Sequence, residues 1–363
     1  MSNPTIVQFG TSRFLQAHAD LFFAQCWPEA KPVTVVQSSG DPSRAERVQA
    51  LARGFKVHVR GVREGALVDE VQAVNSIGRG LSFAADMAEV QRLVVEEADI
   101  ILSNTSDAGF RPSDADKGGQ LDPNMSYPAK LAHLLRGRFD AGGRSLQVMP
   151  TELLRNNGDT LRDLVLGVAS TMDQTYCSWL AEEVIWVNSL VDRIVSEPLY
   201  PAGAIAEPYA LWAIEAQPGL QVPCPHPAIE VVPDLGFIER RKLFVLNLGH
   251  TWMVSVWLAA QRQGADYVRD VMANADWADR LRDVYAKEVR PAFVAAGEDA
   301  GLEAYIDTTL ERFANPFLDH KLADIAQNHT EKTQRRIGAF LSWAEENGDM
   351  GQKPKLRAAM EAN

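Results

Sequence analysis

The sequence predicts an α/β domain of the Rossmann type followed by a mostly α-helical domain. Over the first half of the chain, short apolar runs of strand length alternate with helical patterns, which is typical of a parallel sheet covered by helices. From Phe237 onward, the hydrophobic period is helical almost to the last residue. Five prolines between Pro218 and Pro233 separate the two patterns and exclude a regular helix there. We therefore expect a first domain over residues 1–235 and a second over residues 236–363.

Composition and charge limit the classes of partner. With 363 residues, 46% of them hydrophobic and 23% charged, the chain is an ordinary globular protein with room for two cores. A net charge of −12 argues against general binding to nucleic acids or anionic membranes, and it favours a small-molecule partner. No uncharged apolar run reaches the ~18 residues of a membrane span, and no leader pattern is present. The oligomeric state is not readable from the sequence.

The cysteines give a prediction about metal and compartment. Cys26, Cys177 and Cys224 lie far apart and outside any CxxC or Cys/His spacing. This pattern indicates neither a disulfide framework nor a zinc site. We therefore expect no metal and a reducing, cytoplasmic location.

The first fifty residues have the pattern of a βαβ unit. Residues 5–9 are typical of a buried strand, 10–12 of a tight turn, 13–26 of a helix and 32–36 of a second, parallel strand. Such a turn points backbone N–H groups at an anion, and a dinucleotide pyrophosphate is the natural guest. The GxGxxG fingerprint is incomplete, because Gly10 is followed by Ser12 and Leu15 at the other two glycine positions. The pattern fits a cofactor loop and an ordinary β-turn-α corner equally well.

The end of the second strand leaves the choice between NAD and NADP open. The chain continues Gln-Ser-Ser-Gly-Asp over residues 37–41, with no carboxylate directly at the strand tip. Asp41 could reach the ribose diol of NAD. Alternatively, Ser38, Ser39 and Arg44 could accept the 2′-phosphate of NADP.

The remaining elements follow in order. Polar turns come directly after the predicted strands at 99–103 and 146–149, where open α/β sheets bind ligands, although helix capping would explain the same residues. Further strands are predicted at 55–60, 67–74, 184–187, 191–195 and 206–215. Helices are predicted at 84–97, 127–138, 161–169, 237–262, 266–273, 276–297, 301–312, 318–327 and 331–346, with a charged tail over 348–363.

One stretch, residues 239–250, sets Lys242, Asn247 and His250 into an otherwise apolar run. If the run is a straight helix, His250 lies roughly 80° and Asn247 roughly 140° from Lys242, on one half of the cylinder. Desolvation can pull the pKa of such a lysine towards neutrality, which is the condition for a proton-transfer catalyst. The alternative is a buried helix whose polar residues are satisfied one by one.

Several blocks together resemble a known family. They run in family order over almost the whole chain: 8–18, 103–109, 126–130, 150–159, 191–194, 212–215, the pattern K-x4-N-x2-H at 242–250, and 312–316. The chain is similar to the polyol-specific long-chain dehydrogenase/reductase, or mannitol dehydrogenase, family, and it most resembles tagaturonate and fructuronate reductases. It departs from the family pattern at Ser12 and Gln16. It also ends soon after Leu341, where tagaturonate reductases carry a longer helical region.

The resemblance implies a metal-independent hydride transfer between a nicotinamide and a secondary alcohol or ketone. Lys242 is then the general acid/base, and Asn247 donates to the reacting oxygen. Asn157, beside Asn156, is a candidate second donor. His250 holds the same oxygen or a neighbouring hydroxyl. Glu239 either relays the proton to solvent or pairs with Lys242.

The resemblance also implies binding residues. The candidate cofactor-binding positions are Phe9, Gly10, Thr11, Ser12, Arg13, Phe14, Ser38, Asn104 and Thr105, for NAD or NADP with NAD preferred. Arg312 and Lys321 could bind the anionic end of a sugar acid or sugar phosphate, or they could form surface salt bridges, the reading we prefer for Lys321.

The predicted function is a sugar-acid or polyol oxidoreductase, with tagaturonate/altronate as first substrate choice. The alternatives are a mannitol-type polyol or polyol-phosphate dehydrogenase and a non-catalytic nucleotide-binding sensor. Retention of Lys242, Asn247 and His250 speaks against the sensor.

Overall fold

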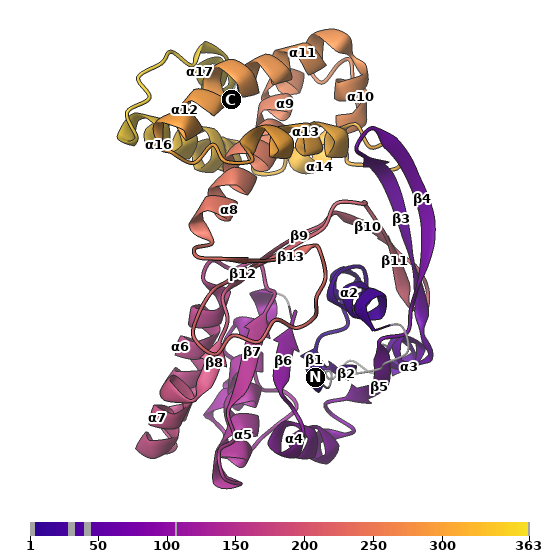
Figure 1. Cartoon of the computed structure of the whole chain (residues 1–363), viewed down its shortest axis with the longest axis vertical. Coiled ribbons are helices and arrows are strands. Elements are labelled where there is room, and N and C mark those ends of the chain that lie inside the picture. Colours follow the sequence, from indigo (N-terminus) through magenta and orange to yellow (C-terminus); the bar gives the residue numbers. More distant parts are fainter. Residues whose placement is uncertain (1–3, 28–32, 40–44, 106, 362–363) are drawn as a thin grey trace. The chain divides into compact units, whose positions relative to one another are not determined.

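The chain divides into two compact units, which Figure 1 shows in a computed structural model that describes residues 4–27, 33–39, 45–105 and 107–361. The parallel-sheet unit contains Met1–Val59, Glu70–Ala206 and Ala210–Leu235. The helical unit contains Gly236–Asn363 together with two earlier pieces, Arg60–Asp69 and Glu207–Tyr209. The predicted fold class, a Rossmann-type domain followed by a mostly helical one, is confirmed.

A six-stranded sheet of parallel strands forms the centre of the first unit. In sheet order its strands are β5 (Ile77–Ser82), β2 (Val33–Gln37), β1 (Ile6–Phe9), β6 (Ile100–Ser103), β7 (Leu146–Pro150) and β8 (Val184–Trp186). Phe9 is opposite both Val36 and Ser103, and Ser103 is opposite Pro150. The residues that follow these strands therefore lie along one edge of the sheet.

The helices of this unit mostly follow the predicted pattern. They are α1 (Arg13–Gln16), α2 (Ala19–Cys26), α3 (Ala45–Arg53), α4 (Met87–Glu96), α5 (Tyr127–Asp140), α6 (Asn157–Ala169) and α7 (Gln174–Glu182), with 3₁₀ turns at η2 (Asp107–Phe110) and η3 (Asp114–Lys117). Apolar side chains of α4, α5, α6 and α7 form one core with the sheet.

The first predicted helix, residues 13–26, is broken in two at His18. The ring of His18 is fully buried, stacks on Phe14 with centroids 4.8 Å apart, and Nε2 lies 3.0 Å from the carbonyl oxygen of Leu211. Arg193 donates to the carbonyl of Ala17 at 2.7 Å, which satisfies one of the groups left open by the break. Burial lowers the pKa of His18 to about 3. Tertiary contacts therefore decided the break, and the local pattern did not reveal it.

Two smaller sheets complete the strands. One has the order β10 (Val195–Pro198), β11 (Gly203–Ala206), β3 (Phe55–Arg63) and β4 (Ala66–Val74). The other has the order β13 (Ile229–Val232), β12 (Leu211–Glu215) and β9 (Ser189–Asp192), with β12 antiparallel to β9 and parallel to β13. Strand β13 lies inside the proline-rich piece, so the prolines exclude a helix there but not a short strand.

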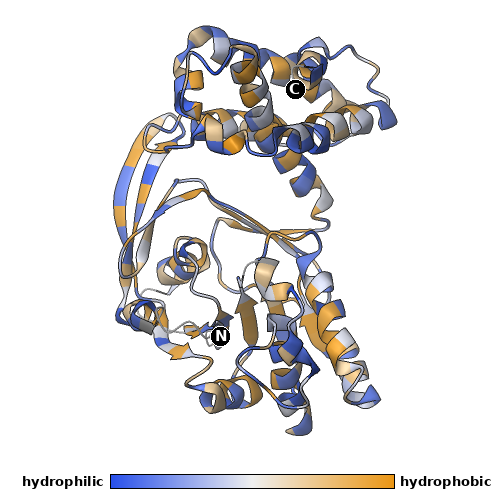
Figure 2. Cartoon of the chain, turned by 180° about the vertical axis from the view of Figure 1, so that it is seen from behind, coloured by the Kyte–Doolittle hydropathy of each residue, from blue (hydrophilic) through white to orange (hydrophobic). Residues whose placement is uncertain are grey.

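The helical unit packs its helices around one apolar core, and hydrophobic and hydrophilic residues alternate along them (Figure 2). Its α-helices are α8 (Gly236–Arg241), α9 (Leu248–Ala259), α10 (Val268–Ala273), α11 (Ala275–Val284), α12 (Arg290–Ala295), α13 (Leu302–Phe313), α14 (Leu322–Ile325), α15 (His329–Thr333), α16 (Ala339–Glu346) and α17 (Pro354–Glu361). Its π-helical segments are η4 (Lys242–Asn247), η5 (Tyr285–Val289) and η6 (Gln334–Gly338). Each π-helical segment lies directly between two α-helices along the chain.

The predicted charged tail is wrong, because residues 354–361 form helix α17. The buried carboxylate of Glu288 accepts the N–H groups of Lys355 and Leu356, each at 3.0 Å. Leu356 and Ala359 are buried in the core of the unit. A carboxylate at the first turn satisfies open backbone donors and favours the helix.

No helix in the described part of the chain combines the length and the apolar character that crossing a membrane requires.

Candidate active site

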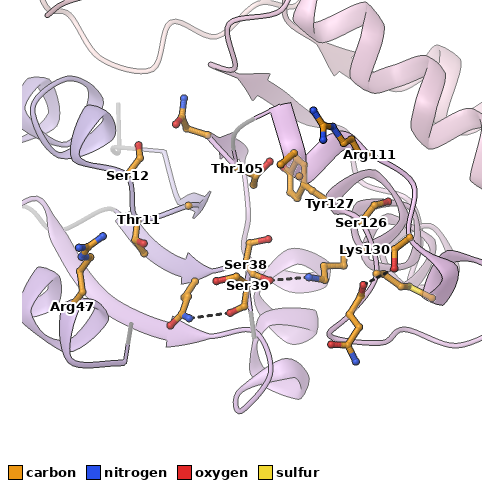
Figure 3. A pocket seen from close by; sticks show the side chains of 18 residues that line it. Thr11, Ser12, Ser38, Ser39, Arg47, Thr105, Arg111, Ser126, Tyr127 and Lys130 are labelled. Carbon is orange, nitrogen blue, oxygen red and sulfur yellow. Dashed lines mark hydrogen bonds between the residues drawn. The ribbon is translucent and has the colours of Figure 1, made fainter. Parts of the chain in front are cut away.

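A cavity of about 600 Å³ opens at the sheet edge of the first unit, where the loops after β1, β2 and β6 come together (Figure 3). Its lining includes Gly10, Thr11 and Ser12 after β1, Gln37 at the end of β2 with Ser38 and Ser39 after it, and Asn104 and Thr105 after β6. The register of the sheet places these loops side by side, as the edge of an open parallel sheet does for its ligands.

Gly10 permits the close approach of two of these loops. Its φ is +122°, a conformation that side chains with a Cβ rarely adopt. A Cβ on Gly10 would lie 2.4 Å from the carbonyl oxygen of Asn104, so any other residue would push the loop after β6 away. The Gly10 N–H donates to the carbonyl of Val36 at 3.0 Å, which ties the same turn to β2.

The loop after β6 is held by a buried carboxylate. Glu152 accepts hydrogen bonds from the Thr105 N–H at 2.7 Å, the Thr105 hydroxyl at 3.2 Å and the Ser103 hydroxyl at 3.0 Å. Burial raises the pKa of Glu152, and these hydrogen bonds oppose the rise. The Asn104 amide donates to the carbonyl of Thr151 at 3.0 Å. The lining groups are therefore fixed by partners outside the cavity.

The cavity is cationic. Arg47 and Arg111 lie on opposite sides of it in Figure 3, and Lys130 is buried beside the end of β2. The Lys130 ammonium donates to the carbonyl of Ser38 at 2.8 Å and lies 5.0 Å from the ring centroid of Phe83. Burial lowers the pKa of Lys130 to about 8. Among the described residues that line the cavity there is no carboxylate, so the donor set fits the phosphates of a dinucleotide.

The predicted cofactor residues divide between the cavity and its surroundings. Six of them line it: Gly10, Thr11, Ser12, Ser38, Asn104 and Thr105. Phe9 is instead buried in the sheet, 5.4 Å between ring centroids from Tyr127. Arg13 is exposed and donates to the carbonyl of Ser196 at 3.3 Å, and Phe14 stacks on His18. Asp41 and Arg44 lie outside the described residues.

Sequence reasoning did not identify Arg111 and Lys130 as cofactor candidates. Each comes from a segment far along the chain from the turn at Gly10, and nothing in the local pattern points into the cavity. The only available signal was the block at 126–130, in which Lys130 occurs.

In the helical unit, a π-helical segment carries two of the predicted catalytic residues. Lys242 begins η4, Asn247 ends it, and His250 follows in the first turn of α9. The angles expected between these side chains assumed a straight α-helix, and they do not hold because the wider π turn lies between Lys242 and His250. Lys242 and Asn247 are half-buried, and so is Glu239 in α8, three residues before Lys242.

The π turn has a specific partner in Tyr285. Its hydroxyl donates to the carbonyl of Val245 at 2.9 Å, and the side chain is buried. A Cβ on Gly249 would lie 2.0 Å from that hydroxyl, so the glycine creates the space that Tyr285 fills. Carbonyls released by an interrupted helical ladder need such partners when they are buried.

His250 is held neutral in the core of the unit. It is 7% exposed, and its ring packs against Phe313 at 4.5 Å and His320 at 4.7 Å between centroids. Burial holds its pKa well below the usual value, and the charges of His320, Arg312, Arg336 and Lys332 act in the same direction. A neutral imidazole can donate or accept a hydrogen bond at a sugar hydroxyl.

The two predicted substrate cations do not form a pair. Arg312 is buried and makes a bidentate salt bridge to Glu207, with Nη2 at 2.8 Å from Oε1 and Nε at 3.0 Å from Oε2. The two side chains are 3% and 1% exposed, so this charge is already compensated within the protein. Lys321, by contrast, is exposed at the start of α14.

Asn157 is anchored by the backbone around it. Its amide nitrogen lies 2.9–3.1 Å from the carbonyls of Pro150, Glu152 and Ser189, and its oxygen accepts from two N–H groups. This arrangement fixes the start of α6 and the loop after β7. The neighbouring Asn156 is exposed, with φ of +48°.

Within the described part of the chain, no three His, Cys, Asp or Glu side chains gather in a way that could hold a metal ion.

Comparison with known proteins covers both units. Residues 4–224 match the family model of the mannitol dehydrogenase Rossmann domain, and residues 234–358 match that of the mannitol dehydrogenase C-terminal domain. Altronate oxidoreductase of Bacillus subtilis is 29% identical over 96% of this chain and 77% of its own length. Altronate oxidoreductase of Yersinia pestis is 28% identical over 98% of this chain and 78% of its own length.

Two solved structures share the fold. A D-sorbitol dehydrogenase in substrate-free form superposes with a TM-score of 0.84 at 22% identity, covering 99% of this chain and 79% of that one. Mannitol 2-dehydrogenase of Pseudomonas fluorescens, in a ternary complex with NAD and D-mannitol, superposes with a TM-score of 0.72 at 16% identity, covering 99% and 78%.

Proposed function

This chain belongs to the mannitol dehydrogenase family, and we propose that it interconverts a secondary alcohol and a ketone on a sugar acid, with a nicotinamide dinucleotide as redox partner. The observation that carries the proposal is the position of Lys242, Asn247 and His250 along the continuous helical run of η4 and α9, inside the region that matches the C-terminal family model. The cationic cavity of the parallel-sheet unit supports it from the cofactor side.

The protein's own residues manage the proton and the developing charge. A bound nicotinamide supplies the hydride acceptor for oxidation and the hydride donor for reduction. In oxidation, Lys242 takes the hydroxyl proton while the carbinol C–H bond breaks. In reduction, its ammonium returns a proton to the carbonyl oxygen. The Asn247 amide donates to that oxygen, and neutral His250 holds the same oxygen or the next hydroxyl.

Two further predicted roles depend on neighbouring groups. Glu239 lies one helical turn before Lys242, at a spacing that suits either relaying its proton or pairing with it. Asn157 can serve as a second donor only by giving up one of its backbone carbonyl partners, so we propose that it acts mainly by fixing the loop after β7.

The cofactor would be held at the edge of the parallel sheet. Thr11 and Ser12 offer donors for phosphates, and the cavity-lining cations Lys130 and Arg47 supply positive charge. NAD is the first cofactor to test, because the related mannitol 2-dehydrogenase structure contains NAD. NADP is the second, because the cations of the cavity suit a further phosphate.

We propose altronate and tagaturonate as the first substrate pair, because the relatives compared above are altronate oxidoreductases. The test is a screen of purified protein with NAD and NADP against hexonates, hexitols and hexitol phosphates, followed through the absorbance of the reduced nicotinamide. We expect the highest kcat/KM for a hexonate. A clear preference for a hexitol or its phosphate would replace the sugar acid with a polyol. No turnover with any of them would overturn the proposed reaction.

A further inference from the structure

Two half-buried cations, Lys332 and Arg336, lie beside the turn that carries Asn247 and His250. They are four residues apart in α15 and η6, which pack against α9 and η4. Nη1 of Arg336 lies 3.1 Å from the hydroxyl of Thr251 and 3.5 Å from the carbonyl oxygen of Asn247. Arg336 is therefore in direct contact with the turn on which the proposed chemistry takes place.

Neither of these two cations forms an ion pair with a carboxylate within the described residues. Lys332 donates to the carbonyl of Ile325 at 2.7 Å, and Arg336 has the two contacts with Asn247 and Thr251. Neither forms an ion pair, whereas Arg312 has the full bidentate partner Glu207. Burial lowers the pKa of both Lys332 and Arg336; for Lys332 the charge of Arg336 acts in the same direction, and the charge of the exposed Glu331 opposes it. Partly buried cations without an anionic partner are costly, so an anion that reaches them would bind strongly.

Two imidazoles next to these cations also have unused hydrogen-bonding atoms. Nε2 of His250 and Nδ1 of His320 are buried and have no hydrogen-bond partner among the described residues. The centroids of the two rings are 4.7 Å apart, and the ring planes make an angle of 72° with each other. The nitrogen atoms at the ring edges therefore point in different directions. A ligand with an anionic end and neighbouring hydroxyl groups would satisfy all of these groups together.

We propose that Lys332 and Arg336 bind the terminal carboxylate of the sugar-acid substrate, while His250 and His320 bind its hydroxyl groups. This assignment rests on the proposed function and deepens it, because it identifies the groups that distinguish a hexonate from a neutral hexitol. Arg312 is not used for the purpose, since Glu207 already neutralises it. The arginine supplies a planar fork of donors, and the lysine supplies a second, compact charge.

The decisive experiment compares a hexonate with the hexitol of the same configuration. Kd is measured by calorimetry with the reduced cofactor present, so that the alcohol is not turned over, and kcat/KM is measured in parallel, for the wild type and for Arg336→Met and Lys332→Met. Each variant is expected to lose about ten- to hundredfold in affinity for the hexonate, the worth of a charge-assisted hydrogen bond. Affinity for the hexitol should change by less than about threefold, because only the hexonate carries the anion.

Two further variants separate binding from scaffolding. Arg335→Met removes an exposed arginine that pairs with Glu331 on the same helix, and it should leave both affinities unchanged. Arg336→Lys keeps the charge and should recover part of the hexonate affinity. Equal losses for hexonate and hexitol in Arg336→Met and Lys332→Met would show a structural role and overturn the proposal.

Failure of the inference and failure of the proposed function give different results. A wild type that turns over hexitols without preferring hexonates keeps the reaction but overturns the carboxylate site. A wild type that turns over neither class removes the proposed function, and the carboxylate site with it.

Discussion

The cofactor cavity and the cation cluster of the helical unit treat positive charge differently. In the cavity, Lys130 is anchored to the end of β2 by the Ser38 carbonyl and faces an aromatic ring. In the helical unit, Arg312 is fully compensated by Glu207, whereas Lys332 and Arg336 have neutral oxygen partners and no ion pair within the part of the chain that the structure describes. The difference separates two uses of positive charge in this protein: the cations at the proposed ligand sites have neutral oxygen partners, whereas Arg312, whose partner is a carboxylate, belongs to the scaffold.

The largest expected effect separates chemistry from cofactor binding. Lys242→Ala should lower kcat by about 10²- to 10⁴-fold, because general acid/base catalysis is worth that much. The Kd for the reduced cofactor, measured by fluorescence titration, should be unchanged, since the cavity residues lie in the other unit. Lys287→Ala, which removes a surface lysine paired with Asp283, is the matched control. Wild-type turnover in Lys242→Ala would remove this lysine from the mechanism.

The next effect tests whether Arg312 is scaffolding. Glu207→Gln leaves the Arg312 charge buried without its carboxylate, which should cost about 3–5 kcal/mol of unfolding free energy in urea titrations. Glu303→Gln breaks the exposed pair with Arg290 and should cost at most about 1 kcal/mol. If Glu207→Gln were as mild as Glu303→Gln, the contrast between Arg312 and Arg336 would disappear.

The smallest effect concerns pH and Lys130. Because burial lowers its pKa to about 8, Lys130 is charged below that pH and neutral above it. Affinity for the anionic cofactor should therefore fall as pH rises through 8, by up to about tenfold, the worth of one hydrogen bond to a charged group. Lys130→Arg keeps its charge throughout and should bind with constant affinity between pH 7 and pH 9 (about one unit either side of the transition). A parallel decline in both proteins would assign the pH dependence to another group.

Several features followed from the sequence because they depend on neighbouring residues. The strand, turn and helix around Gly10 have local signatures, and the polar turns after residues 103 and 149 follow apolar strands. Parallel pairing then places all of these loops on one edge, so the cavity could be predicted from the order of elements alone. The pattern at Lys242, Asn247 and His250 was equally visible, and the family it resembles is confirmed.

Other features depend on contacts between distant residues, and the sequence does not encode them in a readable pattern. The break at His18 depends on Leu211 and Arg193, the helix at residues 354–361 on Glu288, and the π turn after Lys242 on Tyr285. The same reason explains the substrate cations. In the sequence, Arg312, Arg336 and Lys332 look alike, because all three are basic residues on helices. Only the fold decides that Arg312 forms an ion pair with Glu207, whereas Arg336 and Lys332 form none among the described residues.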